Sequence, residues 1–301
     1  MNDPAAAPAN RAVLVMLLGV LLLTIMDALA KRLLEGDVSL AQIMFLRSVL
    51  ICGGLQLLLR ARGDIARLRI VDRRGQLVRG LFGAAAPLLF FSALTRLPLT
   101  AATVVGYAAT FTTVLLSVWW LGERVGRWRW IGIGAGYVGV LVAVLPGGFG
   151  SDDAGSATGY LLAGLASIAI SGYFVAGKRL SATESPLSLV NTYNAMLGLV
   201  CLVALPFVWR VPDPTTLALI GAFALLAVAG QWLLTYAYSI GDASLVAPLE
   251  YTSLLWVILL DVIVWHAPPA GNTLAGAGII VASSLFVMHR ERLNERRAAR
   301  R

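Results

Sequence analysis

The sequence predicts an all-α integral membrane protein of ten transmembrane helices, arranged as two inverted-topology five-helix repeats around a central cavity. Three observations lead to this class. The chain of 301 residues is 58% hydrophobic and has a mean hydropathy of +0.80. Its charged residues make up only 13%, whereas a soluble domain usually carries about 25%. Long apolar runs recur along the chain, and the second half repeats the pattern of the first.

Each predicted span is an apolar run of about 20 residues, the length that a helix needs to cross a bilayer. The runs contain continuous Leu, Ala, Val and Gly without the alternation of a membrane β-barrel, and lipid offers no partner to open backbone groups. The sequence therefore predicts helices. In order they are 12–30, 38–59, 80–96, 99–120, 130–146, 158–177, 187–208, 215–238, 243–265 and 271–288.

The internal repeat follows from two alignments. The stretch from Ala93 to Gly139 has a fainter copy 144 residues later, which pairs Tyr107 with Tyr251. The end of the first run aligns at an offset of 147, so that Lys31 matches Lys178. Because each half has five helices, the second half enters the membrane in the opposite sense, which is typical of transporters. The predicted units are a first repeat at 1–147, an external linker at 148–157, a second repeat at 158–290 and a basic cytoplasmic tail at 291–301.

The distribution of basic residues predicts the orientation. We assign 19 of the 24 Lys and Arg residues to one side of the membrane, among them those at 60–79 and in the tail, and place Lys31 and Arg32 on the other side. Positive loops mark the cytoplasm, so both termini are predicted to be cytoplasmic in a multi-pass protein of the cell (inner) membrane. The net charge of +8 is thus explained by a lipid bilayer as partner, and we predict no binding to nucleic acid.

Several motifs resemble the EamA-type branch of the drug/metabolite transporter superfamily. They are Leu121-Gly122-Glu123 and the glycine-rich run Ile131–Gly139. The front end, with Asp27–Lys31, Gln42–Arg47 and Arg79-Gly80, is similar to a subgroup with S-adenosylmethionine-type and other metabolite carriers. The resemblance implies ten helices in two repeats and a transport function. The second repeat departs from the pattern, because His266-Ala267 stands where the first repeat has Gly122-Glu123.

Ionisable residues inside spans are costly and therefore mark candidate sites. Asp27 and Arg47 lie at matching depths in the first two spans, so they are predicted either to form a fixed ion pair or to meet the substrate. Glu250 follows Pro248, which removes a backbone donor and favours a kink; we interpret Glu250 as the coupling carboxylate. Asp261 is a weaker candidate. For both carboxylates, capping by backbone or by a neighbouring side chain is the alternative.

Polar and aromatic side chains form stripes on several predicted spans. In the fourth span, Thr103, Tyr107, Thr110 and Phe111 share one helix face. In lipid such a stripe must face protein or a cavity, although the same groups also hold helices together. The predicted substrate-binding residues are Asp27, Arg47, Thr103, Tyr107, Thr110, Ser171, Phe174, Asn194, Gln231, Trp232, Tyr236 and Tyr251, with Glu250 for coupling.

Signatures of soluble enzymes are absent from the sequence. It contains neither a Gly-x-x-x-x-Gly-Lys-Ser/Thr phosphate loop nor a His-Glu-x-x-His motif, and its two histidines exclude a His-rich metal site. We predict no cofactor and a secondary transporter, an exporter or exchanger, of a small charged or zwitterionic metabolite. An amino acid derivative or an S-adenosylmethionine-like compound fits, with a proton or counter-substrate as coupling partner. A homodimer is left open. The alternative is a membrane-embedded enzyme or sensor on a helical scaffold.

Overall fold

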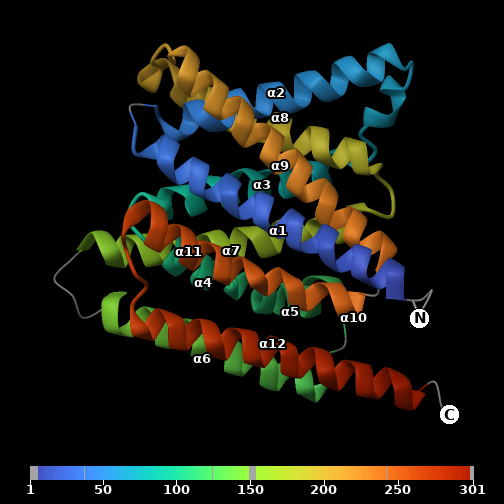
Figure 1. The fold of residues 1–301 in the computed structure, drawn as a ribbon. Helices are drawn as coiled ribbons and strands as arrows, with labels where there is room; N and C mark the ends of the chain where they lie inside the picture. Colours follow the sequence, from blue (N-terminus) through green and yellow to red (C-terminus); the bar gives the residue numbers. More distant parts are fainter. Residues whose placement is uncertain (1–5, 37, 124, 149–153, 242, 299–301) are drawn as a thin grey trace.

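The computed structural model describes residues 6–36, 38–123, 125–148, 154–241 and 243–298. Within these residues all regular structure is helical (Figure 1). The first repeat contains α1 (Ala6–Leu34), α2 (Leu40–Ala61), η1 (Ile65–Leu68), α3 (Arg73–Leu94), α4 (Leu99–Gly106), α5 (Ala108–Leu121) and α6 (Arg127–Gly148). The second contains α7 (Ala154–Leu180), α8 (Pro186–Val208), α9 (Pro214–Ile240), α10 (Ala243–Val246), η2 (Ala247–Thr252), α11 (Ser253–Trp265) and α12 (Gly271–Ala298).

These helices make the ten predicted spans. In the described part of the chain, nine segments are long and apolar enough to cross a membrane by length and hydropathy, and α6, with 22 residues, is the tenth. Two spans are interrupted: α4 and α5 together form the fourth, and α10, η2 and α11 form the ninth. The fourth span was predicted as one continuous helix, so its break is a correction.

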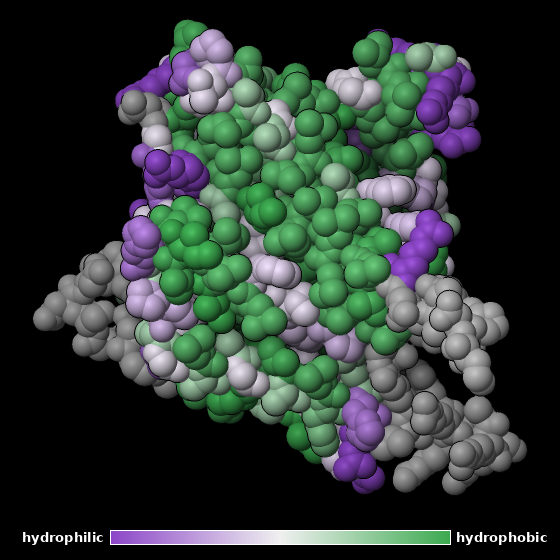
Figure 2. Space-filling model, in the orientation of Figure 1, coloured by the Kyte–Doolittle hydropathy of each residue, from purple (hydrophilic) through white to green (hydrophobic). Residues whose placement is uncertain are grey.

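The two ends of the helix bundle differ in what they carry. In Figure 1, α1 begins and α12 ends at the right, which we call the termini end, and α6 ends and α7 begins at the opposite end, which we call the linker end. Because the number of spans is even, both termini must lie on the same side of the membrane. Figure 2 shows a broad apolar band between the two ends, with hydrophilic residues gathered near them. Large apolar side chains on the spans, such as Phe207 and Val203 on α8 and Leu225 on α9, are more than 70% exposed, as expected for a surface in contact with lipid.

Helix packing follows a pseudo-twofold exchange of the two repeats. Helix α1 packs along α9, and its repeat equivalent α7 packs along α3. Equivalent helices of the two halves also pack together, α2 with α8 and α6 with α12, and α4 packs on α11 of the equivalent ninth span. The α6–α12 contact is the tightest in backbone terms, because a Cβ on Gly276 would stand 2.4 Å from the carbonyl oxygen of Gly139. Glycine at these positions therefore allows the two helices to touch.

Local sequence signals explain where several helices begin and end. The side chains of Ser39 and Ser185 cap α2 and α8, and proline at the first position of α8 costs no hydrogen bond. Helices α5 and α11 end at the repeat-related Gly122 and His266, which adopt the left-handed conformation with φ of 68° and 51°. The motif that differs between the repeats thus has one backbone geometry in both.

Two predicted boundaries need correction. The third span was placed at 80–96, but α3 begins at Arg73, because a helix can carry arginines in its first turns where they reach the headgroup region. Arg79 was counted as a loop charge and is in fact buried inside α3. In addition, α12 continues as a helix to Ala298, through most of the predicted tail. Half of the predicted linker, 149–153, lies outside the described residues, and the other half belongs to the end of α6 and the start of α7.

Glu184, in the α7–α8 connection, ties together two connections at the termini end. Its Oε1 accepts hydrogen bonds from the backbone N–H groups of Val71 and Asp72, both at 2.8 Å, and its Oε2 accepts one from Ser188 Oγ at 3.0 Å. Burial by itself raises the pKa of the Glu184 carboxyl, but these hydrogen bonds outweigh it and hold that pKa below the ordinary value of 4.5. The ionised form is therefore the one that the fold stabilises.

We expect an acid-dependent loss of stability from Glu184. A carboxyl whose pKa is depressed on folding contributes stability above its unfolded pKa, and this contribution disappears as the pH falls through the folded value. Glu184→Gln, which keeps an acceptor but no charge, should flatten the loss of thermal stability below about pH 5. Glu184→Ala should lower the free energy of unfolding by about 1–3 kcal/mol at neutral pH, because two backbone donors lose their acceptor. Identical acid profiles for Glu184→Gln and the unmodified protein would contradict this role.

The orientation in the membrane is tested by labelling. We expect an impermeant thiol reagent to label Asp152→Cys, in the linker outside the described residues, and to leave Arg69→Cys unlabelled in whole cells, because basic loops stay in the cytoplasm. Cys52 is half-buried and Cys201 buried, each inside a span, so the background is low. Labelling of Arg69→Cys alone would reverse the assignment of the two ends.

Candidate functional site

The two helix interruptions meet between the repeats. In the first repeat the chain breaks at Tyr107, between α4 and α5; in the second, η2 contains Tyr251, its repeat partner. The two rings lie 5.1 Å apart between centroids, at an angle of 32°. Pro248, which has no N–H to donate, lies in η2, where a 3-10 helix interrupts the α-helix. Discontinuous helices at the interface of inverted repeats commonly form the substrate and ion sites of secondary transporters.

Hydrogen bonds join the two broken helices. The Tyr107 hydroxyl donates to the backbone carbonyl of Glu250 at 2.9 Å and lies 2.5 Å from Ser253 Oγ. The half-buried Glu250 side chain accepts a hydrogen bond from the Tyr238 hydroxyl at 2.6 Å. Glu250 is thus a carboxylate at a helix break, held by one neutral donor from α9. It forms no ion pair within 4.0 Å among the described residues, and this combination suits a group that gains and loses a proton.

Asp27 on α1 and Arg47 on α2 act on each other electrostatically, but they do not form the predicted direct ion pair. Instead the Arg47 guanidinium lies over the Phe223 ring, with its Cζ 5.4 Å from the centroid, and the buried Arg47 Nε has no acceptor. The field of Asp27 also reaches Tyr107. These two charges therefore do not lock the first helix hairpin. The prediction of a fixed pair was wrong because Arg47 packs its guanidinium against an aromatic face on α9.

Two further predicted residues bring unsatisfied polar atoms to the interior. Thr103 lies one turn before Tyr107 on α4, and its Oγ1 is buried without a hydrogen-bond partner. Asn194 on α8 is 2% exposed; its amide nitrogen donates to the carbonyl of Val190, and its Oδ1 has no partner. Buried polar atoms without partners are rare in folded proteins and call for an explanation. A transported ligand or water would satisfy them.

Other predicted residues lie elsewhere. Ser171 donates to the carbonyl of Ala109 on α5 at 3.0 Å, so its hydroxyl holds two helices together. Phe174 is exposed, whereas the exposed Thr110 stays with the site, because its side chain forms a hydrogen bond with Tyr251. On α9, Trp232 and Tyr236 stack at 5.5 Å with Arg11 over the Tyr236 ring, and Gln231 is exposed beside them, so these three residues form a separate surface group.

Asp261 is a fully buried capping residue, in agreement with the alternative interpretation. Its two carboxylate oxygens accept hydrogen bonds from the backbone N–H groups of Leu99 and Thr100 at the start of α4, at 3.1 and 2.6 Å. Lys31 Nζ lies 3.6 Å from the same carboxylate and donates to the Leu97 carbonyl. The sequence interpretation missed Lys31 because it counted this lysine as a loop charge. The available signal was its match with Lys178 in the repeat.

Lys178 forms the corresponding ion pair of the other half. Its Nζ donates to Glu123 at 2.6 Å, and both side chains are exposed to solvent. The pair connects α7 with the end of α5, whereas Lys31 on α1 connects with α11. In the repeat, α7 corresponds to α1 and α5 to α11, so the two helix pairs are equivalent. One lysine–carboxylate pair therefore lies at each end of the bundle. The pair at the linker end is buried, and the pair at the termini end is exposed.

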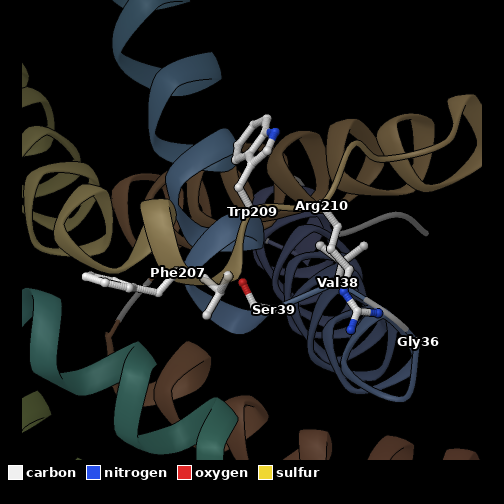
Figure 3. A pocket seen from close by; sticks show the side chains of 7 residues that line it. Gly36, Val38, Ser39, Phe207, Trp209 and Arg210 are labelled. Carbon is white, nitrogen blue, oxygen red and sulfur yellow. The ribbon is translucent and has the colours of Figure 1, made fainter.

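A pocket of about 420 Å³ lies at the linker end, away from these residues. Figure 3 shows it between the α1–α2 connection, with Gly36 and Ser39, and the α8–α9 connection, with Trp209 and Arg210. The Gln42 side chain crosses between the same elements, because its amide bonds both the N–H and the carbonyl of Arg210. The pocket contains none of the predicted site residues. Among the described residues no group of His, Cys, Asp and Glu is arranged to hold a metal ion.

Comparison with known proteins agrees with this architecture. The model of the EamA-like transporter family matches residues 10–145 and again 157–289, one match for each repeat. This chain belongs to the EamA-like transporter family. It is therefore a membrane transporter and not an enzyme, and the alternative of an enzyme or sensor on the same scaffold is set aside. The family also accounts for the two repeats and the ten spans.

Several curated relatives of this EamA-like chain are transporters of different metabolites. The pseudopaline exporter CntI of Pseudomonas aeruginosa is 29% identical over 87% of this chain and 90% of its own length. A riboflavin transporter of Vibrio cholerae is 35% identical over 59% of this chain and 58% of its own. An S-adenosylmethionine uptake transporter of Rickettsia prowazekii is 30% identical over 68% and 70%. A solved crystal structure shares the fold, with a TM-score of 0.60 and 21% identity over 95% of this chain and 98% of that chain.

Proposed function

We propose that this chain is a secondary active exporter of a small zwitterionic or charged organic metabolite, such as an amino acid derivative or an S-adenosylmethionine-like compound. The observation that carries the proposal is the meeting of two broken helices, one from each repeat, at the Tyr107–Tyr251 pair. Around this pair stand a carboxylate on α1, a guanidinium on α2 and a second carboxylate in η2. A ligand with charges of both signs and an apolar body matches these groups.

In the proposed mechanism, the ligand binds between the repeats while they rock about their common axis. Asp27 holds a positive group of the ligand, Arg47 holds a negative group, and Tyr107 and Tyr251 contact its apolar part. Glu250 exchanges a proton at its side-chain oxygen, and Tyr238 donates to the ionised form. Protonation and ligand binding then bias the same helix break, which couples the two movements.

The direction of transport is part of the proposal. A relative that matches 87% of this chain is named an exporter, whereas another is named an uptake transporter. We also propose that the termini end faces the cytoplasm in a bacterial inner membrane, in line with the basic residues near it. A homodimer remains a prediction from the sequence.

Flux through reconstituted liposomes tests the proposal. The purified protein is reconstituted and offered a panel of radiolabelled amino acids, amino acid derivatives and sulfonium compounds, with and without an imposed proton gradient. We expect accumulation of at least one zwitterionic member against its gradient, and its loss when the proton gradient is collapsed. Inverted membrane vesicles from cells then give the direction. Absence of gradient-driven flux for every member would overturn the proposal.

A further inference from the structure

We propose that Arg79 forms an anion subsite of the transport pathway and that the transported metabolite carries a free carboxylate. The inference rests on the proposed function and deepens it, because it names a chemical group of the substrate. Arg79 lies on α3, outside the residues assigned to the site above. Its position in the helix places a guanidinium in the interior of the bundle, between α3, α7 and α8.

The Arg79 guanidinium is oriented by two hydrogen bonds and one ring. One terminal nitrogen donates to the Leu189 carbonyl at 2.8 Å, the other donates to the Tyr173 hydroxyl at 2.7 Å, and Cζ lies 4.2 Å from the Tyr173 ring centroid. The residue is only 6% exposed, and its Nε has no acceptor. A Cβ at position 177 would stand 3.2 Å from this nitrogen, so glycine lets the α7 backbone lie against Nε. Each terminal nitrogen keeps one N–H beyond the one that it donates to Leu189 or Tyr173. The fork is thus fixed in orientation but not saturated.

The charge of Arg79 is not compensated by the described residues. None of them places a carboxylate within 4.0 Å of its nitrogens, and the groups that act on it electrostatically are the phenols Tyr173 and Tyr193. The charge of Arg47 also reaches Tyr173, so two cations converge there, whereas Asp27 acts on Arg47. A buried charge inside a membrane span is costly and is normally paired. Around Tyr173, the described residues therefore supply one positive charge more than their carboxylates compensate.

A carboxylate is the group that best compensates the positive charge of Arg79. Arginine binds planar carboxylates through parallel hydrogen bonds, and its guanidinium remains charged in proteins. A single uncompensated positive charge matches one carboxylate, while a phosphate would bring close to two negative charges. The metabolite would then place its carboxylate between Arg79 and Arg47, the two cations that act on Tyr173, and its amino or other cationic group toward Asp27. This arrangement selects acids and amino acids over their esters and amides.

The test compares free acids with their methyl esters. Thermal unfolding of the purified protein is followed with amino acids, amino acid derivatives and organic acids, each paired with its ester, in chloride buffer of equal ionic strength. A ligand that binds the native state must stabilise it. We expect at least one compound to bind more tightly as the acid, and Arg79→Gln to weaken that binding at least about tenfold while leaving ester binding unchanged. Inorganic phosphate and sulfate serve as further probes; stabilisation by them, but by no carboxylate, would overturn the choice of anion.

Arg290 supplies a matched control. Its Cζ lies 4.2 Å from the Trp128 ring centroid, the same stacking distance as at Arg79, yet it lies near the end of α12. Arg290→Gln should keep the preference for acids. If Arg79→Gln does not fold, Arg79→Lys, which keeps the charge but loses the fork, should show an intermediate preference. The inference fails if no compound prefers its acid form, or if the preference survives at Arg79→Gln. Flux of a substrate that ignores the acid–ester difference would sink the inference and leave the proposed function standing.

Discussion

Glu250→Gln is expected to abolish accumulation of substrate against its gradient while leaving exchange of substrate for substrate intact. Glutamine keeps an oxygen that can accept the Tyr238 hydrogen bond and has nearly the same shape, but it cannot bind or release a proton. Proton binding could then no longer drive the movement at the helix break, whereas the repeats could still move with substrate bound. The measurement is proton-driven uptake and counterflow in the same proteoliposomes, with accumulation falling to the equilibrium level.

Glu123→Gln provides the control for this experiment, because Glu123 is a partly exposed carboxylate that follows the end of α5 and pairs with Lys178, away from the break at Tyr107. It should accumulate substrate normally. Binding by the unmodified protein should depend on pH, and Glu250→Gln should remove this dependence. If Glu250→Gln still concentrates substrate with an unchanged pH profile, the coupling role passes to Asp27.

The second large effect is expected at the linker end of the bundle, where the Lys31–Asp261 ion pair is buried. Asp261→Ala should lower the free energy of unfolding by about 3–5 kcal/mol, because it leaves the Lys31 ammonium without its carboxylate and exposes two backbone donors of α4 to an apolar interior. Lys31→Met should cost less, since the backbone N–H groups of Leu99 and Thr100 still hold the carboxylate. Chemical unfolding in mixed micelles gives both values.

The exposed ion pair at the other end is the comparison for Asp261. Removing the charge in Glu123→Ala should change the free energy of unfolding by about 0–1 kcal/mol, as is typical of solvent-exposed pairs. The double variant Lys31→Met with Asp261→Leu should recover part of the loss, because a packed apolar pair often replaces a buried ion pair without cost. Equal losses at Asp261 and Glu123 would show that burial does not distinguish the two ends.

Hydropathy and repeat spacing were sufficient to predict the ten spans, and the offset of 144 residues predicted that Tyr107 and Tyr251 would come together. These features follow from properties that are local or periodic in the sequence. The helix interruption at Pro248 was predictable for the same reason, because a missing backbone donor acts on its own helix.

The site charges were less predictable, because their partners come from distant helices. Arg79 and Lys31 stand at the edges of apolar runs, where hydropathy cannot separate a loop charge from a buried one. Arg47 was expected to meet Asp27, but a ring from α9 competes for its guanidinium. The stripe of Gln231, Trp232 and Tyr236 lies apart from the Tyr107–Tyr251 pair with Gln231 and Trp232 exposed, and its assignment to the substrate stays a prediction, since composition does not tell which face of a helix its neighbours cover.

The glycine contact between α6 and α12 limits how the molecule can move. Backbones that touch at Gly139 and Gly276 leave no room for one helix to slide along the other. This seam lies at one edge of the bundle, and the α2–α8 pair lies at the opposite edge (Figure 1). We therefore expect the repeats to rotate about the α6–α12 contact, with the largest displacements at α2 and α8. A cross-link within the seam should be tolerated during turnover, whereas a cross-link between α2 and α8 should arrest it.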